Sequence, residues 1–345
     1  MAERKPSWLR IAAPAAQPYR ATAAVIADGD LRTVCSEARC PNKSECFSAG
    51  TATFLILGDT CTRDCRFCAV EQRQGEKGAE AGGRGLTGLD SVTDPWSGAA
   101  AREPEAEAAD EARRVAAAAR RLGLKHVVVT SVTRDDLPDG GAAAFAATVR
   151  ALRETVPEAT VELLVPDMGG SEVALDVILA ERPDVLAHNL ETVPRLYGLV
   201  RPSAAYGRSL GLLARAADWA RGGSPAAAAS GLAHSRTASR PPAASSRPLV
   251  KTSLMVGLGE TDAEIDEVLA DCVATGVDVV TIGQYLQPRA DCLAVARYVP
   301  PARFADWERS GAELGLRVLA GPLVRSSYRA GALLSKKTSH RHSSG

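Results

Sequence analysis

From residue 51 onward the chain alternates short, continuous apolar runs with longer segments of helical periodicity, and this alternation most restricts its fold. Runs that are apolar throughout are typical of parallel strands buried on both faces. Successive strand–helix units connect through right-handed crossovers and build one parallel sheet covered by helices. The predicted strands are Thr51–Asp59, His126–Val132, Thr160–Pro166, Asp184–Asn189, Val250–Leu258, Val277–Tyr285 and Leu316–Val324. The predicted helices are Glu105–Leu122, Gly141–Thr155, Glu172–Ala180, Ala205–Arg221, Asp262–Thr275 and Arg303–Leu314.

The predicted helix Asp262–Thr275 carries its own start and stop signals. Thr261 and Glu264 form a capping-box pattern, and Gly276 stands where the helix should end. The apolar residues between them recur at helical spacing and predict one buried stripe: Ile265, Val268, Leu269 and Cys272. A cysteine in such a stripe is a small core residue, so we do not expect Cys272 to bind metal.

We divide the chain into an N-terminal extension at 1–50, a barrel domain at 51–330 and a polar tail at 331–345. Two stretches interrupt the barrel domain, at 75–101 and 222–248, and both are rich in small and polar residues. Neither contains enough large apolar side chains to offset the entropy of ordering it, so we expect mobile surface insertions. Functional residues of a barrel gather at the C-terminal ends of its strands, which is where we look for the site.

Charge and hydropathy narrow the class of protein. The chain has 41 basic and 41 acidic residues and a formal net charge of zero, with no basic arm or stripe to attract nucleic acid. It has no run of about 18 apolar residues, so we expect no membrane-spanning segment. Met1–Pro14 lacks the apolar region of a signal peptide and is short for a transit peptide, so we expect a soluble protein with no visible presequence.

Six of the eight cysteines lie between residues 35 and 68. A disulfide scaffold is usually a short secreted chain, whereas clustered cysteines in a long chain without a signal peptide indicate a metal site in a reducing compartment. The two remaining cysteines, Cys272 and Cys292, are scattered, and we expect neither to be a ligand.

The second cysteine triplet is Cys61, Cys65 and Cys68, with three and then two residues between its members. It follows the first predicted strand and therefore lies in a loop at that strand's C-terminal end. Three thiolates can hold three irons of a cubane cluster and leave the fourth iron open to a ligand. A structural zinc site requires a fourth protein ligand, and none follows at the usual spacing.

The first triplet, Cys35, Cys40 and Cys46, precedes the barrel and fits no common zinc-finger spacing. Two triplets in tandem indicate two clusters, each lacking one cysteine ligand.

Several long segments, in order along the chain, resemble lipoyl synthases of the radical S-adenosylmethionine (SAM) superfamily. The fold that this implies is a partial (β/α)6-type radical SAM barrel with an N-terminal cysteine-rich extension. The similarity covers most of the chain outside the two insertions and the tail. The segments are RKPSWLR at 4–10, TVCSEARCPNKSEC at 33–46, GDTCTRDCRFCAV at 58–70, TSVTRDDLPDGG at 130–141, HNLETVPRLY at 188–197, KTSLMVGLGE at 251–260, TIGQYLQP at 281–288 and GPLVRSSYRA at 321–330.

The resemblance implies roles for individual residues. Two 4Fe–4S clusters are expected: Cys61, Cys65 and Cys68 would hold the one that binds SAM. The auxiliary cluster would be held by Cys35, Cys40 and Cys46, with Ser327 as its fourth ligand. A serine oxygen is a poorer ligand for an iron–sulfur cluster than thiolate, which suits a cluster that must be opened. The SAM pocket is expected to be lined from strand ends by Asp135, Asp136, Gly140, Gly141, Asn189, Glu191 and Lys251.

The family reaction inserts two sulfur atoms, taken from the auxiliary cluster, at carbons 6 and 8 of a protein-bound octanoyl chain. A radical is chemically reasonable there, since an unactivated methylene has no acidic proton for a general base to remove. The implied partners are an octanoylated lipoyl-carrier domain, of H protein or 2-oxoacid dehydrogenase E2 type, and a reductant such as ferredoxin. The wording of several motifs resembles eukaryotic organellar members, so we expect a plastid or mitochondrion if the source is eukaryotic and otherwise the cytoplasm.

The chain departs from the family at a few positions. Asp64 replaces a usual glycine in the SAM-cluster loop, the segment at 167–171 lacks a usual arginine, and Lys43, Ser44 and Phe47 are atypical beside the auxiliary triplet. Three alternatives stay open at this level: a biotin synthase-like sulfur-inserting enzyme, a non-catalytic protein holding zinc or a redox-sensing cluster, and an inactive homologue that binds clusters.

Overall fold

The computed structural model describes residues 5–10, 13–73, 104–223, 247–328 and 330–331. The two predicted insertions lie almost wholly outside these described residues, as does most of the polar tail, so both predictions stay open. No helix within the described ranges is both long and apolar enough to cross a bilayer.

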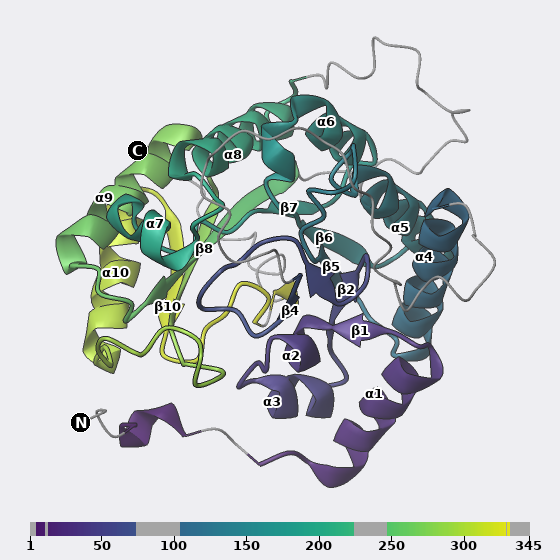
Figure 1. Cartoon of the computed structure of the whole chain (residues 1–345), viewed down its shortest axis with the longest axis horizontal. Coiled ribbons are helices and arrows are strands. Elements are labelled where there is room, and N and C mark those ends of the chain that lie inside the picture. The colour runs from purple at the N-terminus through teal and green to yellow at the C-terminus, as the bar shows by residue number, and fades with distance from the viewer. Residues whose placement is uncertain (1–4, 11–12, 74–103, 224–246, 329, 332–345) are drawn as a thin grey trace, which may run out of the picture.

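One curved sheet of eight strands forms the centre of the fold, and helices pack around its outside (Figure 1). Its strand order is β1-β2-β5-β6-β7-β8-β9-β10. Every neighbouring pair is parallel except β1 and β2, which are antiparallel. The strands are β1 (Arg32–Thr33), β2 (Thr53–Ile56), β5 (His126–Ser131), β6 (Thr160–Leu164), β7 (Val185–Ala187), β8 (Leu249–Val256), β9 (Val279–Gln284) and β10 (Arg317–Gly321).

All seven predicted strands are confirmed, and so is each of the six predicted helices. The crossover helices are α4 (Pro104–Arg121), α5 (Ala142–Thr155), α6 (Glu172–Ala180), α8 (Tyr206–Ala220), α9 (Asp262–Thr275) and α10 (Pro301–Glu313). Six strands, β2 and β5 to β9, are each followed by one of these helices, which is the (β/α)6 unit of a partial barrel. Apolar side chains are buried along both faces of the central strands, as the continuous apolar runs required.

The elements that the sequence did not predict are short or precede the barrel. They are η1 (Ser7–Leu9), α1 (Ala16–Asp28), the edge strand β1, α2 (Val34–Glu37), α3 (Lys43–Ser48), β3 (Thr60–Cys61), β4 (Glu71–Gln72), η2 (Met168–Gly170), η3 (Pro194–Leu196) and α7 (Tyr197–Val200). In the extension, the ring of Phe47 is buried and packs against Tyr19 at 5.4 Å between centroids, and the Lys43 ammonium lies 5.3 Å from the Phe47 ring. The atypical residue Phe47 therefore packs α3 against α1, while Lys43 contacts the Phe47 ring within α3 itself.

Helix α9 confirms the sequence signals at both ends. Thr261 Oγ1 accepts the Glu264 N–H, Glu264 accepts the Thr261 N–H at 2.7 Å, and Gly276 ends the helix in the left-handed conformation at φ 80°. Its apolar stripe is fully buried, and Cys272 belongs to the core as predicted.

After β10 the chain turns back across the fold toward the N-terminal extension. The Asn42 side-chain amide donates to Leu323 O at 2.6 Å, and the Tyr328 hydroxyl donates to Glu45 Oε1 at 2.9 Å. On the way the chain presses against β9, where a Cβ added to Gly283 would lie 2.0 Å from Val324 O. The last strand and the residues around α3 are thus joined by the segment at 322–328.

The close approach at Gly283 predicts opposite effects for two glycine-to-alanine changes. Gly283→Ala should lower the free energy of unfolding by about 1–3 kcal/mol, because the new methyl group overlaps the Val324 carbonyl. Gly211→Ala, on the exposed face of α8 with no atom within 4 Å of the new Cβ, should raise it by up to about 1 kcal/mol through helix propensity. Urea unfolding of both variants measures the difference. Equal stability of Gly283→Ala and the parent chain would contradict the close packing.

Candidate functional site

The second cysteine triplet lies in a loop, residues 57–70, that leaves β2 at its C-terminal end. Leu57 and Gly58 adopt left-handed φ values of 67° and 88°, which end the strand earlier than predicted and turn the chain over the sheet edge. The next strand holds the loop from one side, since the Thr62 N–H and hydroxyl donate to Thr133 O at 3.0 and 3.1 Å. The triplet therefore lies at the edge where the barrel rule predicts a functional site.

The three thiols of this loop lie close enough to affect one another's ionisation. Burial, together with the neighbouring Cys65 and Cys61, raises the pKa of Cys68 to about 12. Burial also raises the pKa of Cys65, while the Arg201 guanidinium acts in the opposite direction. Cys61 Sγ accepts two backbone N–H groups, from Arg63 and Thr133, at 3.4 Å each. The chain thus gathers three soft ligands and supplies donors to one of them.

The connector between α7 and α8 holds the other side of the loop. Val200 O accepts the Arg66 N–H at 3.0 Å, and Ser203 Oγ donates to Asp64 Oδ1 at 2.6 Å. Asp64, the residue that replaces a usual glycine, is therefore bound to the connector by a side-chain hydrogen bond.

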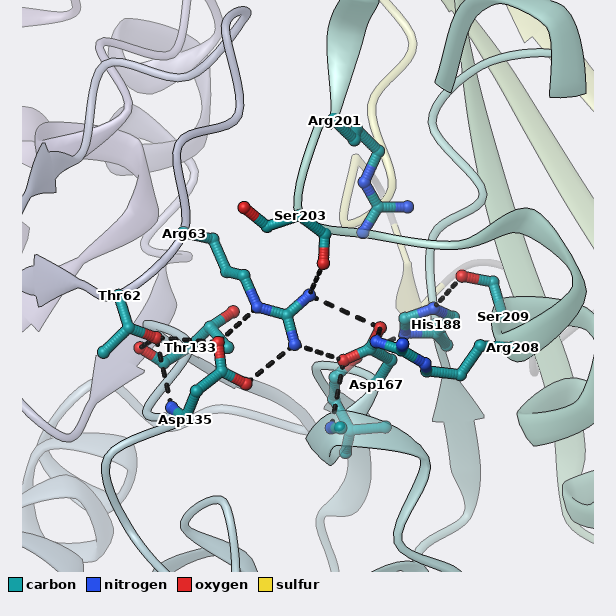
Figure 2. Close-up of polar contacts among 12 residues, drawn as sticks. Thr62, Arg63, Thr133, Asp135, Asp167, His188, Arg201, Ser203, Arg208 and Ser209 are labelled. Carbon is teal, nitrogen blue, oxygen red and sulfur yellow. Dashed lines mark hydrogen bonds and ion pairs between the residues drawn. The ribbon is translucent and has the colours of Figure 1, made fainter. Parts of the chain in front are cut away.

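Arg63 lies between the first two cysteines of the loop and ties together three strand-end segments (Figure 2). Its Nε and Nη2 bind the Asp135 carboxylate, with Nη2 to Oδ1 at 2.7 Å. The same guanidinium donates to Asp167 Oδ1 at 2.8 Å and to Ser203 O at 2.8 Å. These hydrogen bonds raise the pKa of Arg63 and lower the pKa of Asp135, so both groups stay charged.

Asp167 is the buried carboxylate of this network, with 1% of its side chain exposed. Arg208 of α8 binds Asp167 Oδ2 at 3.2 Å, and the Gly169 N–H donates to Oδ1 at 3.2 Å. The loop at 167–171, which lacks the family's arginine, therefore still contacts the cysteine loop, through Asp167 and not through an arginine of its own.

Behind Asp167, His188 is a neutral packing residue. Burial lowers the pKa of His188 to about 4. Because Val165 O lies 2.8 Å from Nδ1 and can only accept, Nδ1 carries the proton, and Nε2 accepts from Ser209 Oγ at 2.9 Å. Figure 2 shows this histidine facing α8.

Asn189 and Glu191 form a polar pair just beyond the end of β7. The Asn189 amide donates to Glu191 Oε1 at 3.0 Å, and burial raises the pKa of Glu191. Glu191 has a left-handed φ of 67° and bridges to Leu254 of β8. Among the described residues Asn189 Oδ1 is buried with no hydrogen-bond partner, and the same holds for Ser131 Oγ and Arg201 Nε. Buried polar atoms of this kind are normally satisfied, and Ser131 at the end of β5 and Asn189 just after β7 both lie at the C-terminal ends of strands, where a polar ligand would satisfy them.

The other expected pocket residues have partners or roles within the chain. Asp136 binds Arg134 at 2.8 Å and Arg73 at 3.2 Å, and Arg134 lowers the pKa of the Asp136 carboxyl. Gly140 and Gly141 have φ values of 59° and 91° and form the turn that begins α5. A Cβ on Gly141 would lie 2.2 Å from the Leu57 side chain, so this glycine lets α5 approach the cysteine loop.

The expected position of Lys251 is wrong. Lys251 is the third residue of β8, is 1% exposed, and pairs with Glu162 of β6, which also lies 3.2 Å from His126 at the start of β5. These positions are near the N-terminal ends of their strands, away from the C-terminal edge where Asn189 and Glu191 lie. The start of the strand agrees with the prediction to within one residue, and a lysine that opens a strand lies at its N-terminal end and not at the edge to which the barrel rule applies.

The first cysteine triplet is gathered by two short helices of the extension. Cys35 lies in α2, Cys46 lies in α3, and Cys40 lies between them with its N–H donating to Cys35 O at 3.2 Å. Burial, together with the nearby Cys35 and Cys40 thiols, raises the pKa of Cys46 to about 12. The structure therefore brings these three residues together as the sequence suggested.

The segment that carries Ser327 lies against this triplet's scaffold. Its neighbour Tyr328 binds Glu45 in α3, one residue from Cys46. Two residues before Ser327, Arg325 is half-buried, and it interacts electrostatically with Cys40 and Glu191. The C-terminal segment therefore passes between the extension and the polar pair at β7.

Among the described residues, no three histidine, cysteine or acidic side chains converge as closely as a single metal ion requires. The thiol positions thus give no support to the mononuclear zinc alternative. Two thiolate triplets, each short of one cysteine, remain the donor set typical of iron–sulfur cubanes.

Several residues of the site carried no signal in the sequence: Arg63, Asp167, Arg201, Ser203 and Arg208. For Arg63 the reason is distance along the chain, since its partners Asp135 and Ser203 lie 72 and 140 positions away. For Arg63 the sequence offered one hint of a role in the site, since it is a charged residue between two cysteines of the triplet.

The chain matches known proteins over most of its length. The family model of the radical SAM superfamily matches residues 55–272. The lipoyl synthase of Oleidesulfovibrio alaskensis is 45% identical over 97% of this chain and 96% of its own length. Those of Caldanaerobacter subterraneus subsp. tengcongensis and Thermus thermophilus are each 44% identical over 97% of this chain, covering 99% and 88% of their own lengths. These relatives are bacterial, so they lend no support to the expected organellar location.

Solved structures give a more distant likeness. Streptococcus suis SuiB bound to S-adenosylmethionine has a TM-score of 0.45 and 10% identity, covering 81% of this chain and 54% of its own. Coproporphyrinogen III oxidase from Escherichia coli, described as a radical SAM enzyme, has a TM-score of 0.45 and 12% identity, covering 75% of this chain and 51% of its own.

The raised thiol pKa values predict slow alkylation of the cluster-free protein. At pH 8.5 a thiol with a pKa near 12 has on the order of a thousandfold less thiolate than one at the ordinary value of 9.0, and the thiolate is the nucleophile. Cys46 and Cys68 should therefore react with iodoacetamide far more slowly in the folded protein than in guanidinium, and the folded rate should still rise between pH 9 and 11. Peptide mass spectrometry measures both rates. Equal rates in the two states would contradict the burial of these thiols.

Proposed function

Since the chain belongs to the lipoyl synthase family of the radical SAM superfamily, we propose that its two cysteine triplets hold two 4Fe–4S clusters. Cys61, Cys65 and Cys68 hold the cluster that binds SAM. The chain is a sulfurtransferase of the radical SAM type, and its product is the lipoyl group. The main support for this assignment is the position of the loop at 57–70, which holds three thiols at the C-terminal edge of the sheet.

The residues present fit these groups. Three thiolates match three irons and leave one iron for the amino and carboxylate groups of SAM. The unsatisfied polar atoms Ser131 Oγ, Asn189 Oδ1 and Arg201 Nε supply hydrogen-bond capacity for a polar cosubstrate at the same strand ends. When bound, the cluster and SAM together supply a radical able to remove hydrogen from an unactivated methylene.

The chain's own residues bind SAM and fix its orientation. Asn189 and Glu191 are held as one unit by their hydrogen bond and by the bridge to β8, so a ligand group placed against them has a fixed orientation. Gly140 and Gly141 keep the backbone before α5 close to the loop. Asp135 and Asp136 are kept as proposed pocket residues, although arginines bind both oxygens of each carboxylate. Lys251 is left out because it lies inside the barrel.

Cys35, Cys40, Cys46 and Ser327 are proposed as the ligands of the auxiliary cluster, which is the source of sulfur. The contact between Tyr328 and α3 supports this set, because it places the serine segment beside the helix that carries Cys46. Three soft thiolates with one harder oxygen leave a weaker corner, and that is a reasonable property for a cluster from which sulfur is removed.

The substrate and partners follow from the family alone. We propose an octanoylated lipoyl-carrier domain as the acyl donor, with sulfur entering at carbons 6 and 8, and a small reductant such as a ferredoxin as the electron source. A location in the cytoplasm agrees with the bacterial relatives.

Mass spectrometry of an octanoylated carrier peptide tests this function. The reconstituted protein, incubated without oxygen with SAM and dithionite, should add two sulfur atoms to the peptide and release 5′-deoxyadenosine. Cys40→Ala and Ser327→Ala should abolish or strongly reduce sulfur insertion while 5′-deoxyadenosine still forms. Cys61→Ala should abolish both products, because it removes a ligand of the cluster that binds SAM.

The outcomes separate the alternatives. Formation of 5′-deoxyadenosine without sulfur transfer by the parent chain would mean that the acyl substrate is wrong. Two loaded clusters with neither product would favour the inactive homologue, and a colourless protein containing zinc would favour the non-catalytic one.

A further inference from the structure

We propose that Arg63 is a positioning residue that fixes the SAM-cluster loop through its planar guanidinium fork. This inference rests on the proposed assignment of Cys61, Cys65 and Cys68 as ligands of the cluster that binds SAM. It concerns what holds the loop in place, which the ligand assignment leaves open.

The contacts of Arg63 join three separate parts of the site (Figure 2). Nε and Nη2 bind Asp135, which follows β5, and Nη2 and Nη1 reach Asp167, which follows β6, at 2.8 and 3.4 Å. Nη1 also donates to Ser203 O, in the connector that precedes α8, at 2.8 Å. All three guanidinium nitrogens are therefore used, and only 9% of the side chain is exposed.

The neighbours of Arg63 reach only some of these segments. Thr62 binds Thr133 and Asp135 beyond β5, Asp64 binds Ser203, and Arg66 binds Val200. Among the described polar contacts of the loop, the contact with Asp167 comes from Arg63. The β6 end of the barrel is thus tied to the cluster loop by this one side chain.

The geometry calls for arginine and not merely for a positive charge. A guanidinium presents several N–H donors in one rigid plane and can bind two carboxylates at once, whereas a lysine ammonium is a single flexible point charge. Lysine at this position would keep the charge near Asp135 but could not span both carboxylates and the Ser203 carbonyl.

Arg63 separates two ligand cysteines, so its position governs where their thiolates lie relative to Asn189 and Glu191. A displacement of the loop by about 1 Å would misplace the cluster against the strand-end residues, and such errors cost on the order of a hundredfold in rate. The potential of the cluster would also change, since it depends on nearby charge and hydrogen bonds.

The test compares Arg63→Gln and Arg63→Lys in the cluster-loaded full chain, with Arg150→Gln as the matched control. Arg150 is an exposed arginine of α5 that pairs with Glu181 on the outside of the barrel. Iron content, thermal unfolding, the rate of 5′-deoxyadenosine formation, and the change in the electron paramagnetic resonance spectrum of the reduced cluster on adding SAM are measured for each.

Both Arg63 variants should keep their iron, slow 5′-deoxyadenosine formation by about 10- to 100-fold, and show an altered or missing spectral response to SAM. Arg150→Gln should match the parent chain in all measurements. Restoration of parental rate and spectrum by Arg63→Lys would overturn the proposal, because charge alone would then suffice, and parental behaviour of Arg63→Gln would overturn it outright.

A third variant covers the case in which loss of Arg63 prevents folding or loading. Asp135 is 36% exposed, so Asp135→Asn should fold, and it removes one of the two carboxylates that the fork binds. We expect it to slow SAM cleavage by at least about threefold with a changed spectral response; a parental spectrum and rate would overturn the proposal. Failure of the parent chain itself to cleave SAM would instead overturn the proposed function, so the two failures are distinguishable.

Discussion

The parallel pairing of β2 through β10 determines where every part of the site lies. Because parallel strands direct all their C-terminal ends to one edge, segments more than 100 residues apart in sequence meet there, as Arg63 and Asp167 do. The cysteine loop leaves the first of these strands, and the segments after β5, β6 and β7 supply its neighbours. One sheet therefore provides a rigid base for a loop that would otherwise be held only at its two ends.

Charge at this edge is balanced locally. Asp135 and Asp136 are paired with Arg63 and Arg134, and the buried Asp167 is shared by two arginines. Such pairs leave few uncompensated charges beside the thiols, and a buried unpaired charge would be costly. Glu191 is the exception: it has a raised pKa and faces Arg201 and Arg325 only at longer range. Most polar groups at this edge are therefore hydrogen-bonded within the chain. The Asn189–Glu191 pair keeps unused hydrogen-bonding capacity, which a binding site needs in order to hold a polar ligand.

The strands, the helices and the cysteine groups were predictable because each depends on local chemistry. Continuous apolar runs identified β5 and β9, and the Thr261–Glu264 box fixed the start of α9 to the residue. The pocket role expected for Lys251 conflicted with the predicted strand, because a residue that opens a strand lies away from its C-terminal end. Its pairing with Glu162 was not predictable, since that partner lies on another strand. The role of Arg63 failed to appear for the same reason, because its three acceptors come from three separate loops.

The two cysteine triplets are held in different ways, and the difference agrees with the chemistry proposed for them. The loop of Cys61 is fixed by the sheet edge, the connector before α8 and the Arg63 network. The triplet of Cys35 lies on two short helices and the turn between them, and the segment that carries Ser327 reaches this scaffold through side-chain hydrogen bonds of Asn42 and Tyr328. A cluster that binds SAM must return unchanged to the same geometry in every cycle, which favours many fixed contacts. A cluster that gives up sulfur must be rebuilt, so its scaffold has to release and regain a ligand, and a serine on a terminal segment can do this without disturbing the barrel.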